Sequence, residues 1–444
     1  MNLKLTSILF FTCFAISYSQ SYIGHSIDNY AGVHGVIYNP ANVVSSKFRT
    51  DINLGSVSIF GGSDYATFNF DGITEGDDDF EFDLDDDANT SPSNANNFFY
   101  NADILMPSFM FNLSKRSSIG LITRVRGHLN VNSINGELFE SVVNDFEDNE
   151  DFDFDSSNLS STTHLWAEVG LAYGRILIEK PKHMLSGGVT LKYLLGGGAS
   201  YFNTPGLAGI YTDANETLAS QGALNVGTSF DIDENDDDYT FDDVMPGFGA
   251  DIGFNYEWHP KREANDSLRH FQSRYKLKIG LSVTDIGKIT YKDSKISSFD
   301  LNRTVSTTTY DSDVLEFLED NYDNIDQDED MDIQLPTALH LMIDYRLGKR
   351  FLLNAQANVN MVSSSKLQSN RIINTYTLTP RFESKWLSFF TPLSIREYDG
   401  FVAGAGLRFG PFSVGSGTIL TNLMSDDSQT ADVFVGLKIP VYRK

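Results

Sequence analysis

The sequence predicts an all-β fold: a transmembrane antiparallel β-barrel of about 14 strands, with about 16 as the alternative count, an N-terminal plug segment and long acidic extracellular loops. Three observations lead to this fold. The chain begins with an export signal, its later segments alternate apolar and polar residues over the length of a membrane strand, and its connectors alternate between short basic and long acidic ones.

Residues 1–19 are typical of a cleaved signal peptide. Lys4 supplies a positive charge, 5–16 is an apolar run, and 17–19 (Ser-Tyr-Ser) is a small-x-small cleavage site. No later run approaches the roughly 20 apolar residues that a membrane helix needs. An exported chain that stays in a membrane without such a helix must close its backbone hydrogen bonds as a barrel. We therefore expect a protein of the outer membrane of a Gram-negative bacterium, in contact with outer-membrane lipid.

The run 248–258 shows the period of two that a membrane strand requires. One alternate set is mostly aromatic or aliphatic, and the other is small or polar. The runs 339–347 and 351–361 repeat this pattern. Because charges on only one face suit a wet lumen, we expect the following side chains to face the lumen: Asp251, Glu257, Asp344, Arg346, Asn354, Gln356, Asn358 and Arg408.

Periodic runs of this kind recur along the whole chain after residue 50. The expected strands lie near 50–71, 98–113, 118–131, 164–178, 184–196, 246–259, 273–285, 334–347, 351–362, 373–383, 386–396, 401–409, 412–421 and 431–442. These ranges make fourteen strands, an even number, which returns both termini to the periplasm. The first run is long enough for two strands and 223–231 could form another, which gives the higher count.

The connectors between these runs are of two kinds. Short basic connectors, such as 114–117, 180–182 and 348–350, belong to the periplasmic side of a barrel. Long acidic connectors belong to the cell exterior, and they run through 72–97, 132–163, 197–245 and 286–333. Their alternation is an independent check on the strand count.

Three acidic runs, 75–87, 137–155 and 231–243, contain no Lys or Arg. One interpretation is a solvated loop surface whose charges repel each other. The other is loose Ca²⁺ binding, because closely spaced carboxylate oxygens are hard ligands. The candidate ligands for this second interpretation are Asp77, Asp78, Asp79, Asp233, Asp236 and Asp238. Asp236 stands where the EF-hand pattern requires glycine, so a specific EF-hand site is not expected.

Two loop segments, 138–146 and 314–325, carry apolar residues at helical spacing and predict short amphipathic helices, the second with a cap among 311–313. No nucleophile, metal-protease or phosphate-binding motif occurs in the sequence, so we do not expect an enzyme or a cofactor. The net charge of −27 disfavours nucleic acid as a partner.

Two stretches, 247–257 (GFGADIGFNYE) and 280–287 (GLSVTDIG), resemble the DUF5723 family of Bacteroidetes outer-membrane proteins, as do 379–383 (TPRFE) and 409–416 (FGPFSVGS). The resemblance implies an outer-membrane barrel and no assigned chemistry. The element 38–41 (Tyr-Asn-Pro-Ala) is similar to one in the more remote FadL-like superfamily, which includes the type IX secretion protein PorV. It implies that 20–49 form a plug seated by Asn39 and Pro40, with the barrel over 50–444, although Asn-Pro also starts ordinary turns.

These observations favour a FadL-like channel or porter for a small, hydrophobic solute. The alternative is a barrel that transports nothing and serves as a scaffold for secretion, gliding or cell-surface protein partners. Apolar residues lining the lumen beside the plug would favour the porter. A filled, polar lumen with a broad outer surface would favour the scaffold.

Overall fold

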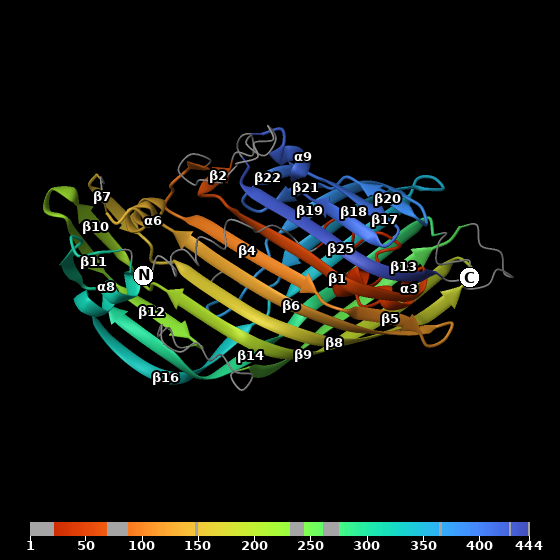
Figure 1. Cartoon of the computed structure of the whole chain (residues 1–444), viewed down its shortest axis with the longest axis horizontal. Helices are drawn as coiled ribbons and strands as arrows, with labels where there is room; N and C mark the ends of the chain where they lie inside the picture. The colour runs from red at the N-terminus through yellow and green to blue at the C-terminus, as the bar shows by residue number, and fades with distance from the viewer. Residues whose placement is uncertain are drawn as a thin grey trace.

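The computed structural model of the protein describes residues 22–68, 88–146, 150–230, 244–260, 275–311, 313–363, 366–425 and 428–442. Most of them belong to one antiparallel sheet of 19 strands. The sheet closes on itself because β25 (Thr430–Tyr442) pairs with β1 (Phe48–Ser63) along nearly all of its length. The result is a barrel whose strands run obliquely to its long axis (Figure 1).

Fourteen positions make up the closed ring of strands, three of them occupied by an interrupted strand. In order after β1 they are β4 (Asn96–Leu105) with β5 (Ser108–Asn112), β6 (Ser117–Ile134), β8 (Ser160–Lys180), β9 (His183–Asn203), β13 (Met245–Trp258), β14 (Leu277–Asp300), β17 (Ala338–Arg346), β18 (Phe351–Asn360), β19 (Thr375–Glu383), β20 (Leu387–Phe390) with β21 (Leu393–Arg396), β22 (Gly400–Ala403) with β23 (Ala405–Phe409), β24 (Phe412–Ser416) and β25. The expected transmembrane barrel of about 14 strands is confirmed.

Proline or glycine lies at each interruption in the ring. Pro107 separates β4 from β5, and Pro392 separates β20 from β21. Proline has no amide hydrogen for the ladder, which favours a break at these two positions. Gly404 separates β22 from β23, where a Cβ atom would overlap the backbone of Ser416 and Gly417.

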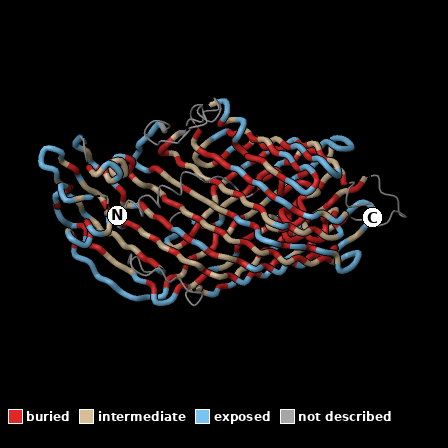
Figure 2. The backbone as a smooth tube through the Cα atoms, in the orientation of Figure 1, coloured by how far each residue is buried: buried red, intermediate tan, exposed pale blue. Residues whose placement is uncertain are grey.

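Buried residues alternate with partly or fully exposed residues along the strands of the ring (Figure 2). On β13, Phe254 is 42% exposed on the outer face, whereas its neighbour Asn255 is 1% exposed on the inner face. The outward set on the ring is apolar and includes Ile252, Leu281, Leu341, Ile343, Tyr376, Phe389, Val433 and Leu437. An apolar outer band over a polar interior is the arrangement that lipid requires of a barrel.

Three strands, β8, β9 and β14, continue beyond the ring on one side and form what we call the distal extension. There β12 (Ala223–Thr228) lies between β9 and β14, and β16 (Asp323–Gln334) pairs with the other edge of β14. The run expected near 223–231 is thus a strand, but it does not enlarge the ring. The connectors expected as loops over 197–245 and 286–333 are partly strand, because the ladder continues where neither face needs apolar residues.

The end of the distal extension has a hydrophobic core of its own. A four-stranded sheet of β15 (Arg303–Ser306), β11 (Thr217–Gln221), β10 (Ala208–Thr212) and β7 (Phe152–Asp155) packs with α6 (Gly136–Val143) and α8 (Val314–Asn321). Phe154, Tyr211 and Phe317 lie in this core. Both expected loop helices are confirmed, and the Asp313 side chain caps α8. This helix ends at Asn321, four residues short of the expected segment, because β16 begins at Asp323.

The remaining elements are short. They are α2 (Val33–Tyr38), α3 (Asn42–Ser45), α9 (Ile419–Asn422), the 3-10 turn η2 (Asp213–Asn215) and the hairpin of β2 (Ala66–Phe68) and β3 (Ala88–Thr90). None of the helices in the described ranges is long and apolar enough to cross a membrane.

Candidate functional site

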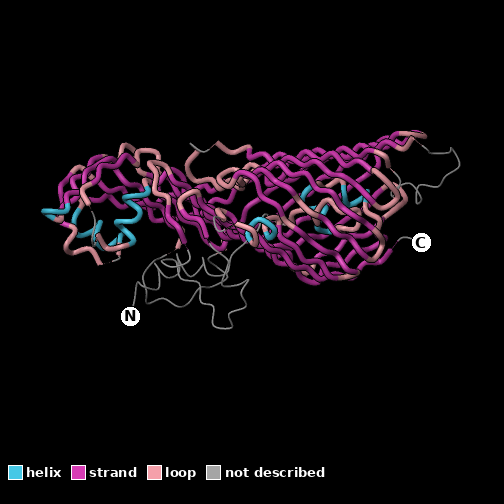
Figure 3. Tube along the Cα trace, turned by 90° about the horizontal axis from the view of Figure 1, so that it is seen from above, coloured by secondary structure: helices cyan, strands magenta, loops and turns pink. Residues whose placement is uncertain are grey.

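Residues 22–47, called the N-terminal segment below, lie inside the ring. Figure 3 shows its two short helices, α2 and α3, enclosed by barrel strands. The helix α3 contacts β5, β6, β8 and β9, and α2 contacts β1, β5, β6 and β14. Tyr22, Val33 and Val43 are buried together with wall residues such as Phe390 and Phe434. Packed side chains therefore fill the lumen around α2 and α3.

Asn39 joins the turn between α2 and α3 to the barrel wall. Its amide group donates to the Phe254 carbonyl of β13 at 3.1 Å and to the Leu281 carbonyl of β14 at 3.4 Å. Its side-chain oxygen accepts from the Ala41 amide at 2.9 Å, which fixes the turn. Gly253 lies directly against this side chain, and a Cβ atom at Gly253 would overlap the Asn39 oxygen.

Pro40 occupies a second close approach to the wall. A Cβ atom at Gly188 on β9 would overlap the Pro40 backbone, so only glycine leaves room there. A little further along, the Ser45 and Ser186 hydroxyls lie 3.1 Å apart. The structure thus places Asn39 and Pro40 at the contact between the N-terminal segment and the strands β9, β13 and β14.

Buried charges also attach the segment to the wall. Asp28 accepts from the Arg408 guanidinium at 2.9 Å, and both side chains are at most 1% exposed. Lys47 forms an ion pair of 2.8 Å with Glu383. Lys438 donates to the Tyr30 carbonyl at 2.5 Å and to the Ala31 carbonyl at 2.8 Å. Removing one member of such a pair leaves a buried charge without its partner, which costs about 3–5 kcal/mol.

A second group of charges lines the wall, and its side chains pair with one another. Arg124 of β6 binds Asp103 of β4 at 2.5 and 3.1 Å and Glu168 of β8 at 3.0 Å. Its neighbour on the same face, Arg126, reaches Asp285 of β14 at 2.8 Å.

Lys192 of β9 completes this network. It pairs with Asp285 at 2.6 Å and with Asp251 of β13 at 2.8 Å. Three cations and four carboxylates therefore join six neighbouring ring strands. Paired charges of this kind make the wall rigid. Their side chains also occupy part of the lumen and keep it polar.

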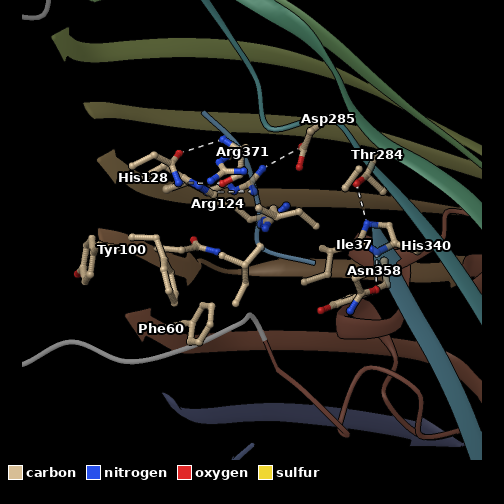
Figure 4. A pocket seen from close by; sticks show the side chains of 18 residues that line it. Ile37, Phe60, Tyr100, Arg124, His128, Thr284, Asp285, His340, Asn358 and Arg371 are labelled. Carbon is tan, nitrogen blue, oxygen red and sulfur yellow. Dashed lines mark hydrogen bonds and ion pairs between the residues drawn. The ribbon is translucent and has the colours of Figure 1, made fainter. Parts of the chain in front are cut away.

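A small cavity of about 70 Å³ lies between the segment and this network (Figure 4). One side is apolar, the opposite side carries arginines, and the segment closes one end. The residues concerned are Phe60, Phe99 and Ile373 on the apolar side, Arg124, Arg126 and Arg371 on the charged side, and Ile37 and Tyr38 from the segment. A buried cavity of about 150 Å³ admits benzene, so this cavity is too small for a hydrocarbon ring as it stands.

The side chains expected to face the lumen are distributed over this interior. Buried inside the ring are Asp251, Glu257, Asp344, Asn354, Gln356, Asn358 and Arg408. Arg346 is only half buried and lies at the rim, where it donates to the Tyr275 and Lys349 carbonyls. Asp251 belongs to the wall network, Asn358 lines the cavity, and Arg408 holds the segment.

Some important residues were not singled out from the sequence. Arg124, Arg126, Glu168, Lys192 and Asp285 form most of the wall network. A signal for the first two was present, because Arg124 and Arg126 alternate with apolar residues in the run 118–131. Their carboxylate partners could not be found this way, since pairing across strands depends on register.

The candidate Ca²⁺ ligands Asp77, Asp78, Asp79, Asp233, Asp236 and Asp238 lie outside the described residues. The same holds for residues 1–19. Within the described ranges, no three His, Cys, Asp or Glu side chains are grouped so that they could hold a metal ion.

A family model described as "Family of unknown function (DUF5723)" matches residues 40–417. No curated protein matches the chain. Among solved structures, the toluene transporter TbuX of Ralstonia pickettii is 10% identical with a TM-score of 0.45, covering 93% of this chain and 95% of its own. A FadL homologue of Pseudomonas aeruginosa is 11% identical with a TM-score of 0.45, covering 95% of this chain and 98% of its own. The toluene transporter TodX of Pseudomonas putida is 9% identical with a TM-score of 0.40, covering 95% of this chain and 96% of its own. These likenesses are remote and concern the overall fold.

Proposed function

Because this chain belongs to DUF5723, a family of unknown function, its role has to be inferred from its own residues, and we propose an outer-membrane porter for a small, partly apolar solute, closed by its N-terminal segment. The apolar outer band of the ring faces lipid in this proposal. The distal extension lies outside the cell, and the short basic turns lie in the periplasm.

The cavity beside the N-terminal segment is the observation that carries this proposal. An apolar surface on one side and guanidinium groups on the other suit a solute with a small apolar body and a polar group. Ile37 and Tyr38 of the segment form part of the same cavity. Movement of the segment would therefore change the size of the cavity and open a route past it.

The way in which the segment is held also favours movement. None of its described residues pairs in the barrel sheet, and its attachments are side-chain hydrogen bonds, ion pairs and packing. The segment can leave its place without breaking any rung of the ladder that keeps the barrel stable in lipid. The barrel is the fixed part of the device and the segment is the movable part.

Swelling of proteoliposomes in a series of solutes tests this function. We expect the wild-type protein to admit small solutes that carry both an apolar and a polar part. Phe60→Ala should raise the rate for bulkier members of the series, because the removed ring enlarges the cavity. Phe389→Ala, which removes a ring from the outer face, is the matched control and should change nothing. Swelling equal to that of protein-free liposomes for every solute would rule out the porter.

A scaffold remains the second candidate function, and two observations favour it: apart from the small cavity the described lumen is filled, largely by polar side chains, and the barrel carries the distal extension. That part has its own core and an acidic surface that includes the exposed residues 323–330 of β16. Such a surface suits a basic protein partner at the cell surface.

A disulfide between Ser45→Cys and Ser186→Cys separates the two functions in living cells. The lock holds the N-terminal segment in place and leaves the distal extension unchanged. A cell carrying the locked protein should resemble the gene deletion if the protein is a porter, and the wild type if it is a scaffold.

A further inference from the structure

The N-terminal segment buries two histidines, His25 and His34, whose surroundings disfavour a positive charge. Neither ring is exposed to solvent. The two rings touch edge to face, with centroids 4.9 Å apart. Protonating either one would place a cation beside the other ring, inside an apolar part of the lumen.

His25 is the more isolated of the two. Its ring packs beside both Phe390 of β20 and Phe434 of β25, at centroid distances of 6.4 and 5.9 Å, and these two rings also stack on each other at 6.3 Å. Neither ring nitrogen has a hydrogen-bond partner among the described residues. Stacking on aromatic faces returns about 1 kcal/mol to a cation, which is less than the cost of burying two unpaired N–H groups on a charged ring.

His34 has one partner and lacks a second. Its Nε2 lies 2.9 Å from the Ser56 hydroxyl of β1, and its Nδ1 has no hydrogen-bond partner in the described part of the chain. A neutral imidazole is satisfied by one such bond at Nε2. An imidazolium would bury a second N–H group; the Ala31 carbonyl and Asp103 favour its charge, but burial away from water outweighs them.

The charged groups around these rings oppose protonation as well. Lys438 of β25 disfavours a positive charge on either ring, and Arg408 of β23 disfavours one on His25. Each neighbouring carboxylate is already engaged: Asp28 with Arg408, Asp103 of β4 with Arg124, and Asp51 of β1 with the Val33 amide and, at 3.9 Å, Lys438. Among these carboxylates in the described part of the chain, only the Asp51 Oδ1 atom has no hydrogen-bond partner, and Lys438 already lies 3.9 Å from it.

We propose that acid unseats the N-terminal segment, because its seated form accepts His25 and His34 only as neutral rings. In the released segment both imidazoles meet water and take up protons below about pH 6.5. Protons therefore bind the released form more strongly, and lowering the pH shifts the equilibrium towards release. The consequence for solute entry rests on the proposed porter function, whereas the release itself does not.

The size of the shift follows from the pKa of a free imidazole, about 6.5. Between about pH 7.5 and about pH 5, one histidine that is protonated only after release raises the release equilibrium about 30-fold. Two independent histidines raise it about 900-fold.

A thiol at position 45 reports release directly, because Ser45 is buried against Ser186 while the segment is seated. The full-length Ser45→Cys protein is treated with a water-soluble thiosulfonate at about pH 7.5 and about pH 5. The rate at which its thiol is modified is divided by the rate for Lys115→Cys, an exposed turn position. The ratio removes the intrinsic pH dependence of thiol chemistry. Flux of solute into proteoliposomes is measured on the same preparations.

We expect the rate ratio to rise several hundred-fold on acidification in the wild-type background. The rise should fall to about 30-fold in His25→Phe, which keeps the aromatic stack, and in His34→Gln, which keeps the bond to Ser56. It should vanish in the double variant and persist fully in His164→Gln, a buried wall histidine bonded to Tyr291. An equal rise in the double variant, or no rise in the wild type, would overturn the inference. A normal rise without any change in flux would instead contradict the porter.

Discussion

At the scale of single residues, several attachments of the N-terminal segment join positions far apart in the chain. Arg408 binds Asp28 across 380 residues of sequence. The alternation of apolar and polar residues predicts that Arg408 faces the lumen, but it cannot name the partner. The partner depends on how the ring closes and how deep the segment lies, and neither property is local.

Removing one of these buried charges should loosen the segment. In Asp28→Ala the Arg408 guanidinium loses its carboxylate, at a cost of about 3 kcal/mol to the seated form. The normalised reactivity of a thiol at position 45 should rise by about 100-fold at neutral pH. Asp153→Ala, at an exposed position of the distal sheet, is the control and should leave the reactivity unchanged. Equal reactivity in both variants would show that this ion pair does not hold the segment.

At the scale of elements, the strands of the ring were predictable, whereas of the separate distal strands only the run near 223–231 was. Lipid on one face and water on the other impose alternation on runs such as 339–347. In the distal part of β14 and in β16 both faces meet water or a local core, so residues 323–330 are exposed and acidic on either side. A sequence of this kind looks like a loop even though its backbone is paired.

Substituting arginine on the outer face of the ring and on the distal sheet distinguishes a surface that faces lipid from one that faces water. Ile343 is 42% exposed on the outer face of β17, and Ile210 is 56% exposed on the distal sheet. Ile343→Arg should cost about 2–4 kcal/mol near the middle of the bilayer, whereas Ile210→Arg should cost almost nothing. Urea titration of the two variants in lipid vesicles measures the difference. Similar midpoints would mean that the outer band around Ile343 does not face lipid.

At the scale of the whole molecule, the barrel has one end with short basic turns and one end with a large acidic extension. This polarity predicts which end lies outside the cell. Cysteines introduced at Asp153 and Asp326 should react with a membrane-impermeant reagent on intact cells, and cysteines at Lys115 and Lys349 should react only after lysis. The natural chain interferes little, because its one cysteine is Cys13. The reverse labelling pattern would contradict the proposed orientation.

The central claim is that the N-terminal segment closes the lumen and opens it by moving. Single-channel recording of the Ser45→Cys/Ser186→Cys barrel in a planar bilayer tests this claim most directly, since the same molecules are measured with the disulfide formed and after reduction. We expect no openings in the oxidised state and openings that return on reduction, more often at acidic pH. In each single-cysteine variant, the reductant should not change the frequency of channel openings. Openings that continue unchanged with the disulfide fully formed would contradict the account.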